Sequence, residues 1–462
     1  MKTYAYWSFD RYRPCVHGND SIYITRIVPS ENGFEIWHDF NGKCGLYYRE
    51  AESENEYLCV RADNGYAHLL DLTNDTEYEF YISDGSENTS AIGYVHTGYA
   101  PGTVVNYLSK NDKKYDFSGK YLCTPSILCH PNGYMLVSMD IYEAKGGQNL
   151  TLIFRSDDEG KSWYHLSELF PCYWGTLFLH KGEVYMLGTS TEYGDMLIGK
   201  SIDGGKTWLV PTVIHRGSCN CAIPGWHKSS CRVVEHEGRI WCAYDYGSHA
   251  TGGHASCVIS ADVDSDILCP ESWSITEPLI YNENWFGACL EDRRGCIEGC
   301  VVAGKDNKLY NVLRYSMSKG TPNYGKIARL AIYTDEPERS LEFDKFIPFA
   351  GNHSKFDIVY DNVSEKYWSI ISRIRDEKCV NHRNLLSLVC SEDMEQWELV
   401  TDLIDYTDKD PKYHGFQYVS MTIHENDIRY ACRTATNCAN NFHDSNYITY
   451  HTVKNFRKYI KK

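Results

Sequence analysis

The stretch Ser156-Asp-Asp158-Glu-Gly160-Lys-Ser-Trp163 returns further along the chain as Ser201-Ile-Asp203-Gly-Gly205-Lys-Thr-Trp208. In both copies an Asp side chain can accept hydrogen bonds from turn amides, and a Gly permits the tight backbone of such a turn. The Trp that closes each copy is large enough to pack between two sheets. Ser391-Glu-Asp393-Met-Glu-Gln-Trp397 is a degenerate third copy. A turn that recurs in this way indicates a repeat architecture.

Paired apolar segments surround these turns and recur along the chain. Six pairs of candidate strands, each joined by a turn with Gly, Asn or Asp, occupy residues 124–130 with 134–140, 175–180 with 183–190, 229–236 with 239–245, 299–303 with 309–314, 356–360 with 367–373, and 417–424 with 427–433. A period of several tens of residues is typical of a β-propeller, in which radial repetition protects the sheet edges. We therefore expect a six-bladed β-propeller over residues 101–462.

The first hundred residues have a different pattern, with short alternating strands separated by Gly, Asn and Asp clusters. Within them, Leu72-Thr-Asn-Asp-Thr-Glu-Tyr78-Glu-Phe80 resembles the fibronectin type III segment in which a Leu, a Thr and a Tyr precede and enter the penultimate strand. The resemblance implies a corner hydrogen bond from Tyr78. Ala100-Pro101-Gly102 is a natural boundary, because Pro and Gly interrupt regular structure. The expected fold is all-β, with a small fibronectin type III-like β-sandwich over residues 1–100 ahead of the propeller.

The composition of the chain limits the classes of partner and the cellular compartment that we expect. The formal net charge is −16, and no basic stripe is present that could neutralise a row of phosphates, so nucleic acid is not expected as a partner. The 19 cysteines sit mostly singly inside apparent strands, as Cys123 and Cys242 do, which favours free thiols in a reducing compartment. No signal-type apolar run opens the chain and no run of about 18 apolar residues follows, so we expect a cytoplasmic protein without membrane contact.

No Cys and His grouping has the spacing of a zinc site: Cys219 and Cys221 are too close together, and Cys296 with Cys300 lacks a second pair. Neither a metal nor another cofactor is predicted. The aromatic content of 14% suits pleated sheets and also provides platforms for sugar rings. A carbohydrate is thus the partner that composition favours, while the oligomeric state stays open.

The rim of a propeller can be read from the sequence, because the innermost strand of each blade starts, and the second strand ends, on the same face. The starts are Cys123 with Thr124, Tyr173 with Trp174, His227 with Lys228, Glu298, Lys355, and Gln417 with Tyr418; the ends are Asp140, Ser190, Asp245, Arg314, Arg373 and Arg433. Carboxylates come mainly from the first three blades and arginines from the last three. The planar fork of Arg grips a carboxylate, so the rim suits an anionic substrate. Any one of these groups could equally form an interblade ion pair.

The recurring turns match the Asp-box, S-x-D-x-G-x-[ST]-W, of sialidases and related propellers. The stretch from Glu298 to Arg314 resembles the sialidase segment in which a Glu opens an inner strand and an Arg closes the next. Gly415-Phe-Gln-Tyr418-Val-Ser420 resembles the family's opening of the last inner strand. The chain departs from the family at Cys123-Thr-Pro125, where sialidases have Arg-Ile-Pro.

This resemblance implies that Tyr418 is a nucleophile, that Glu298 polarises it, and that Arg314 belongs to a clamp for a substrate carboxylate. It also implies that the Asp-boxes lie on the face away from the active site. A Tyr with an ordinary pKa of about 10 is a poor nucleophile until a neighbouring base takes its proton. Glu298 is the base that the sequence offers.

The leading hypothesis is an exo-acting glycoside hydrolase that removes a polar, acidic sugar from a glycan. Tyr418 or a water attacks the anomeric carbon, Glu298 activates it, and Asp140 or Asp245 donates the proton. The expected substrate contacts are Arg314, Arg373, Arg433, Lys355, Trp174, His227, Gln417, His443 and Asp444. One alternative is a polysaccharide lyase in which Tyr418 or His443 removes the C5 proton of a uronic acid. Another is a non-catalytic propeller on which Trp174 and tyrosines stack sugars.

Overall fold

The computed structural model describes residues 21–288, 295–315, 325–351 and 353–460. Within these ranges the chain forms β-strands and short 3-10 helices, and no α-helix. None of the helices in the described ranges has the length and apolar character needed to cross a bilayer. The cysteines in these ranges are free, and Cys123 and Cys242 lie inside strands β9 and β19 as expected.

The N-terminal strands form two sheets packed face to face. One has the order β1-β2-β5, from β1 (Ile24–Ser30), β2 (Gly33–His38) and β5 (Tyr66–Leu69); the other has the order β4-β3-β6-β7, from β3 (Gly45–Glu50), β4 (Leu58–Arg61), β6 (Glu77–Ser83) and β7 (Gly93–His96). Their inner faces share one core that includes Ile36, Leu46 and Phe80. The corner bond is present, because the Thr73 amide donates to the Tyr78 hydroxyl at 3.0 Å. Assignment of this sandwich to the fibronectin type III fold stays a prediction.

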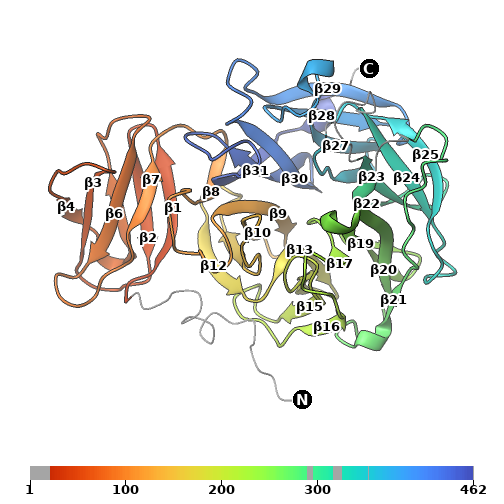
Figure 1. Cartoon of the computed structure of the whole chain (residues 1–462), viewed down its shortest axis with the longest axis horizontal. Helices are drawn as coiled ribbons and strands as arrows, with labels where there is room; N and C mark the ends of the chain where they lie inside the picture. Colours follow the sequence, from red (N-terminus) through yellow and green to blue (C-terminus); the bar gives the residue numbers. More distant parts are fainter. Residues whose placement is uncertain (1–20, 289–294, 316–324, 352, 461–462) are drawn as a thin grey trace.

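The rest of the chain forms six sheets arranged around a central axis (Figure 1). Blade one contains β9 (Tyr121–Cys129), β10 (Met135–Tyr142), β11 (Thr151–Ser156) and β12 (Tyr164–Leu169). Blade two contains β13 (Tyr173–His180), β14 (Glu183–Thr189), β15 (Met196–Ser201) and β16 (Thr212–His215). Blade three contains β17 (Gly225–His227), β18 (Val234–His236), β19 (Arg239–Ser248), β20 (Gly253–Asp262) and β21 (Trp273–Ile275).

Blades four and five have four strands each, as blades one and two do. Blade four contains β22 (Cys296–Ala303), β23 (Leu309–Tyr315), β24 (Lys326–Ile332) and β25 (Glu342–Pro348). Blade five contains β26 (Ile358–Asp361), β27 (Lys366–Ser372), β28 (Leu385–Ser391) and β29 (Trp397–Asp405). The six strand pairs expected from the sequence are therefore the two inner strands of successive blades.

The last blade closes the ring. It contains β30 (Gly415–His424), β31 (Asp427–Ala435) and β32 (Tyr447–Val453), and its outermost strand is β8 (Thr103–Tyr107) from the beginning of the propeller. Because β8 comes from the beginning of the propeller and β30, β31 and β32 come from its end, this shared sheet joins the two ends of the domain and closes the ring. Val105 at the centre of β8 is fully buried.

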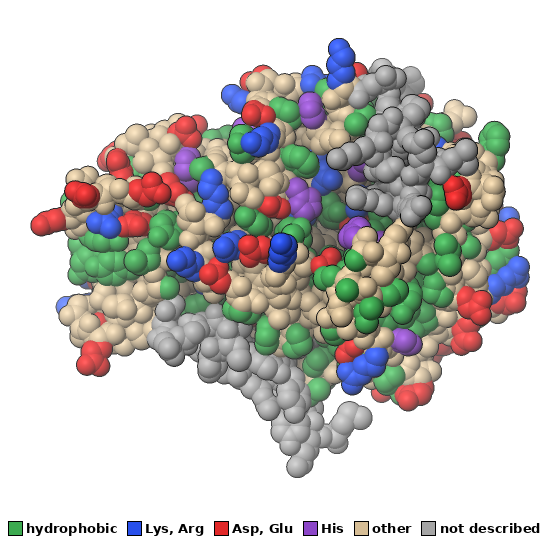
Figure 2. All heavy atoms as spheres, viewed as in Figure 1, with side chains coloured by type: hydrophobic (Ala, Val, Ile, Leu, Met, Phe, Trp, Pro, Cys, Tyr) green, Lys and Arg blue, Asp and Glu red, His purple; other side chains and the backbone are tan. Residues whose placement is uncertain are grey.

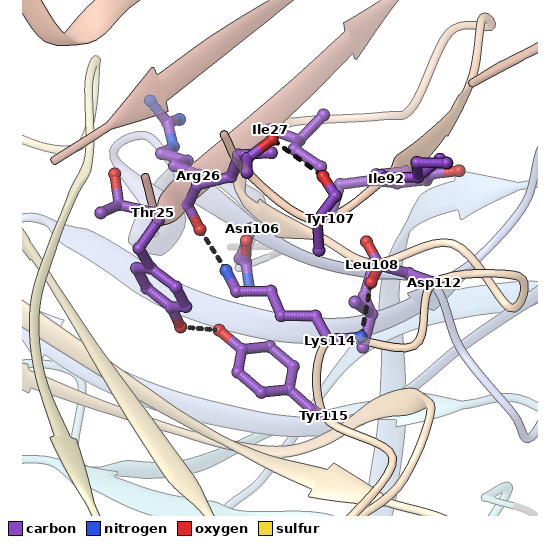
Figure 3. A pocket seen from close by; sticks show the side chains of 15 residues that line it. Thr25, Arg26, Ile27, Ile92, Asn106, Tyr107, Leu108, Asp112, Lys114 and Tyr115 are labelled. Carbon is purple, nitrogen blue, oxygen red and sulfur yellow. Dashed lines mark hydrogen bonds between the residues drawn. The ribbon is translucent and has the colours of Figure 1, made fainter. Parts of the chain in front are cut away.

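The sandwich is attached to the propeller beside blade six. The Arg26 side chain donates to the carbonyls of Val104 and Val105 on β8. Near this contact a cavity of about 30 Å³, large enough for about one water, lies beside Lys114, whose ammonium is 3.8 Å from the Tyr23 ring centroid (Figure 3). The two parts therefore share a continuous interface.

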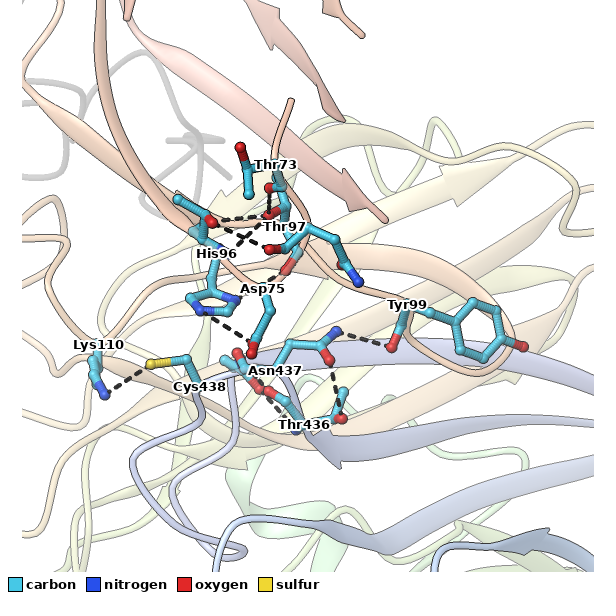
Figure 4. A network of polar contacts seen from close by, with 12 residues as sticks. Thr73, Asp75, His96, Thr97, Tyr99, Lys110, Thr436, Asn437 and Cys438 are labelled. Carbon is cyan, nitrogen blue, oxygen red and sulfur yellow. Dashed lines mark hydrogen bonds and ion pairs between the residues drawn. The ribbon is translucent and has the colours of Figure 1, made fainter. Parts of the chain in front are cut away.

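A second polar contact joins the same two parts (Figure 4). The Asn437 amide donates to the Tyr99 carbonyl at 2.9 Å, and Lys110 lies 3.2 Å from the Cys438 sulfur. The first of these bonds connects the link after β7 with the loop after β31, so the sandwich contacts blade six at more than one place. The second lies within the propeller, between the segment after β8 and the same loop.

The recurring turns that indicated the fold have the expected hydrogen bonds. Asp158 accepts from the Ser162 amide at 2.9 Å, Asp203 from the Thr207 amide at 2.8 Å, and Asp393 from the Glu395 amide at 2.8 Å. At Gly160, with a φ of 84°, an added Cβ would meet the Tyr450 ring at 2.1 Å, so only glycine fits there.

The Trp residues of these turns pack at the boundaries between blades. Trp163 contacts Tyr450 of blade six, with ring centroids 5.4 Å apart, and Trp397 contacts Phe349 at 5.2 Å. Trp208 donates its indole N–H to the Gly205 carbonyl at 3.0 Å and packs on blade one. These turns therefore join neighbouring blades.

Candidate functional site

Four inner strands begin with the same backbone feature. Thr124, Trp174, Glu298 and Tyr418 have φ values of 47°, 51°, 57° and 52°, and each lies where the pairing register of its strand shifts. A left-handed residue other than glycine costs roughly 1–3 kcal/mol, and a bulge of this kind turns a side chain out of the regular alternation. At Glu298 and Tyr418 this backbone conformation lies on the rim, where it aims the two side chains at each other.

The centre of the site is a hydrogen-bonded pair from blades four and six. The Tyr418 hydroxyl lies 3.0 Å from Oε1 and 3.1 Å from Oε2 of Glu298. Nε of Arg314 is 2.5 Å from Oε2 of the same carboxylate. The structure thus brings together the three residues for which the resemblance implied a shared role. In Figure 2 charged and His side chains gather around the hollowed centre of the propeller.

Electrostatics assigns different protonation states to the pair. Burial opposes ionisation of Glu298, but the Arg314 guanidinium, with His227 and the Tyr418 hydroxyl, outweighs it and holds the pKa of Glu298 below its usual value. Burial raises the pKa of Tyr418, although nearby arginines act in the opposite direction. At neutral pH the pair is therefore a carboxylate that accepts from a phenol.

Three guanidinium groups surround this pair. Besides Arg314, Cζ of Arg433 lies 5.3 Å from the Tyr418 ring centroid, and Arg383 donates to Gln417. Burial lowers the pKa of Arg383 to about 10, and the positive charges of Arg314 and Arg433 contribute in the same direction. Three cations and one carboxylate leave an excess of positive charge, which suits an anionic ligand.

Arg383 was missed by sequence reasoning, and Arg373 was wrongly placed in the site. Arg373 instead donates to Asp402 at 2.8 Å and to Ser387 at 3.0 Å, toward the outer strand of blade five. Arg383 precedes the third strand of its blade and bridges to Gly415. Because the rim was read only from the first and second strands, that position was not considered.

Asp140 and Asp245 do not face an open pocket. Their exposed fractions are 0% and 1%. Asp140 accepts from the Thr151 hydroxyl at 2.5 Å and from the amides of Trp174 and Gly175. Asp245 accepts from the Glu298 amide at 2.9 Å. Amides turned out of the sheet ladder at a bulge need acceptors, and these carboxylates provide them.

Burial also sets the protonation of these two carboxyls. It raises the pKa of Asp140 to about 7, against the opposing effect of the Thr151 hydroxyl and the two amides. It raises the pKa of Asp245 as well, opposed by His227. We correct both from proton donors to positioning residues, because neither carboxyl reaches the surface that a substrate would touch.

The remaining predicted contacts divide into two groups. His443 and Asp444 adjoin the site: Arg433 donates to the His443 carbonyl, and His443 Nδ1 lies 3.0 Å from Asp444. Burial lowers the pKa of His443 to about 4, with Arg433 acting in the same direction, and Asp444 has a pKa lowered to about 2 because its hydrogen-bond partners outweigh burial. Gln417 is buried and donates to the Phe442 carbonyl, so it positions Arg383.

The second group lies beneath the rim. Lys355 is buried and donates to the Val419 carbonyl at 3.0 Å, so it stabilises an inner strand. We therefore assign it a structural role in place of the substrate contact expected from the sequence. Trp174 is 7% exposed and packs on the His227 ring at 4.3 Å, which leaves no open face for a sugar. His227 is itself buried and bonds Asp245.

A histidine cluster adjoins the site and was also missed. One ring nitrogen from each of His227, His249 and His254 lies within 4.8 Å of the others. His249 and His254 flank the short turn between β19 and β20, in the stretch His-Ala-Thr-Gly-Gly-His. The signal available in the sequence is the spacing of His249 and His254 across a hairpin, which differs from the spacing of cysteine pairs in zinc sites.

Comparisons with known proteins place the fold. No family model matches the chain, and neither does any curated protein. Among solved structures it is similar to a Fusarium graminearum α-L-arabinofuranosidase in complex with an iminosugar inhibitor, with TM-score 0.53, 13% identity, and coverage of 78% of this chain and 99% of that one. A Penicillium chrysogenum α-L-arabinanase complexed with arabinobiose gives TM-score 0.52 and 14% identity over 78% and 99%.

A Hadza microbial sialidase is similar over 94% of this chain and 92% of its own, with TM-score 0.51 and 11% identity. At such low sequence identity the similarity is evidence for the fold alone. Together with the six radial sheets, it shows that this chain has the sialidase-like six-bladed β-propeller fold.

Proposed function

We propose that the protein is an exo-acting glycoside hydrolase that removes a polar, acidic sugar from a glycan. The observation that carries the proposal is the bond between the Tyr418 hydroxyl and both oxygens of Glu298, formed at strained positions of two different blades. Similar structures named as glycosidases support the same class of reaction.

The chemistry follows from the protonation states. Glu298 takes the phenolic proton as the Tyr418 oxygen attacks the anomeric carbon, and the bond from that carbon to the leaving oxygen breaks. The leaving oxygen takes a proton from water, since Asp140 and Asp245 are enclosed beneath the rim. Water then attacks the anomeric carbon of the glycosyl-tyrosine, and the departing Tyr418 oxygen takes back the proton held by Glu298. The proton lost by the attacking water neutralises the hydroxide left by the first step.

The acidic specificity rests on Arg314, Arg383 and Arg433. A carboxylate on the sugar would offset their mutual repulsion, and guanidinium groups bind carboxylates through paired hydrogen bonds. A neutral sugar provides no such compensation. We therefore propose an acidic sugar over a neutral one such as the arabinobiose that is bound in one of the similar structures.

The test is a screen of aryl glycosides of acidic and neutral sugars, followed by variants on the substrate that is cleaved. Tyr418→Phe and Glu298→Gln should each lower kcat by about 10²–10⁴-fold, the contribution of a positioned proton acceptor and its nucleophile. Tyr413→Phe and Glu342→Gln, on exposed side chains, are the matched controls. If Glu298→Gln is folded and its kcat equals that of the wild type, the proposal is wrong.

A β-elimination is the second candidate, favoured by the absence of an exposed carboxyl at Asp140 and Asp245. In a lyase, Tyr418 with Glu298 would remove the C5 proton of a uronic acid while the three arginines neutralise its carboxylate. The C4–O bond breaks, the leaving oxygen takes the proton removed from C5, and a C4–C5 double bond forms. An unsaturated product that absorbs in the near ultraviolet would identify this reaction, and a saturated reducing sugar would identify hydrolysis.

A further inference from the structure

We propose that His227, His249 and His254 form a binding site for a divalent transition metal such as Zn²⁺, next to the Tyr418–Glu298 pair. The three rings are contributed by the end of β17, the turn after β19 and the start of β20. Their ligand-capable nitrogens already lie within 4.8 Å of one another. Three imidazoles with one open position are a ligand set that zinc commonly takes.

The hydrogen bond of His227 supports a metal. Its Nδ1 lies 3.2 Å from Oδ2 of Asp245, which leaves Nε2 as the ligand atom. A carboxylate behind a histidine fixes the ring orientation and makes the opposite nitrogen a better ligand, as is usual around bound metals. Asp245 is fully enclosed, so this orientation does not depend on solvent.

His254 supplies a second, independent observation. Its Nε2 is buried and has no hydrogen-bond partner among the described residues. A buried polar nitrogen without a partner costs about 1–3 kcal/mol, and a metal ion would satisfy it.

The distances require a small contraction. Zn–N bonds of about 2.0–2.1 Å place tetrahedral ligand nitrogens about 3.4 Å apart. His249 is exposed and lies on a short 3-10 turn followed by two glycines, Gly252 with φ 100° and Gly253 with φ 133°. That turn can move inward without disturbing a strand.

The surrounding charges decide whether a cation is tolerated. Arg314 is near enough to affect His254 and opposes a metal. The carboxylate of Asp245 bonds His227, and that of Glu298 interacts electrostatically with the same ring, so both favour a metal. Asp245 also accepts from the Glu298 amide, so a metal on His227 would be connected through one carboxylate to the strained residue that bonds Tyr418.

The experiment is a Zn²⁺ titration of the chelator-treated full-length protein by calorimetry, with Co²⁺ absorption as a second measurement. The wild type should bind one equivalent, and the Co²⁺ protein should show visible bands of a low-coordinate nitrogen site. His249→Ala should weaken binding at least about tenfold. Because His249 is exposed, this variant should fold normally.

Two further variants complete the test. His254→Gln should also weaken binding, and its melting curve shows whether it is folded; His68→Ala, on an exposed position of the sandwich, should bind as the wild type does. Failure of the wild type to bind Zn²⁺, or unchanged affinity in His249→Ala, would overturn the proposal. Neither readout depends on turnover, so the proposed glycosidase reaction stands or falls separately.

Discussion

At the scale of single residues, two arginines of blade five differ in what surrounds them. Arg383 lies among Arg314, Arg433 and the Tyr418 ring, whereas Arg373 is neutralised by Asp402. Positively charged groups that are held close together without enough acid partners lower one another's pKa, and the arrangement persists only where the fold imposes it. Such a group is therefore a strong candidate for an anion contact.

Replacing Arg383 by Gln should lower kcat/KM for an acidic substrate by about 10–100-fold, the value of a charge-assisted hydrogen bond of about 1.5–3 kcal/mol. Arg373→Gln should leave kcat/KM within a factor of two or so, roughly the scatter for a surface ion pair. Steady-state kinetics on both variants checks this, with melting curves to confirm folding. Equal losses in the two variants would contradict the assignment.

Asp140 gives a pH-dependent prediction. Because burial raises its pKa from 3.8 to about 7, the folded protein retains a proton that the unfolded chain releases above pH 4 or so. The stabilisation from this group is thus complete below that pH and is lost as pH rises through about 7. The full effect is at most about 4 kcal/mol.

Asp140→Asn cannot ionise, so its melting temperature should fall less than that of the wild type between pH 5 and pH 8, from about two units below the raised pKa to about one unit above it. Melting curves across this range make the measurement. Asp264→Asn, on an exposed carboxylate, is the control. If the wild type and Asp140→Asn show parallel pH profiles, the carboxyl is not titrating in this range.

At the scale of elements, the recurring turns act between blades. Trp163 is almost fully buried against Tyr450, whereas the adjacent Tyr164 is exposed. Trp163→Ala should therefore destabilise the protein by about 3–5 kcal/mol through the cavity it leaves. Tyr164→Ala, on the outer side, should change stability by under about 1 kcal/mol. Urea unfolding followed by fluorescence compares them, and similar midpoints would show that Trp163 does not join the blades.

The bulges show why strands were easier to predict than side-chain roles. Alternation of apolar residues located β9, β13, β22 and β30 from the sequence, because burial of one face is a local property. The positive φ at Trp174 and Glu298 is imposed by partners in other blades. In the sequence alone Asp245 has the position of a catalytic acid, because its partner, the Glu298 amide, belongs to another blade.

At the scale of the whole molecule, the fold was predictable because its signals repeat: three similar turns and six strand pairs point to one architecture. The pairing of Glu298 with Tyr418 was implied by the resemblance to sialidases, and the position of each at the start of an inner strand agrees with it. Arg383 and the cluster of His227, His249 and His254 were not predictable, since turns and third strands meet the rim only after the ring closes.

Ring closure depends on β8, the first strand of the propeller and the last of blade six. Val105→Asp would place an unpaired charge in that core, and it should destabilise the protein by about 3–5 kcal/mol. Limited proteolysis should then cut first within blade six. Thr103→Asp, at the half-buried end of the strand, is the milder control. Cleavage elsewhere, with blade six intact, would contradict closure by β8.

The pairing of Tyr418 with Glu298 is tested most directly by a double-mutant cycle on kcat for the best substrate from the glycoside screen. Two residues that act as one unit are non-additive, so Tyr418→Phe combined with Glu298→Gln should be no slower than the slower single variant, within about threefold. If the losses multiply instead, the phenol and the carboxylate act independently, and the central claim is wrong.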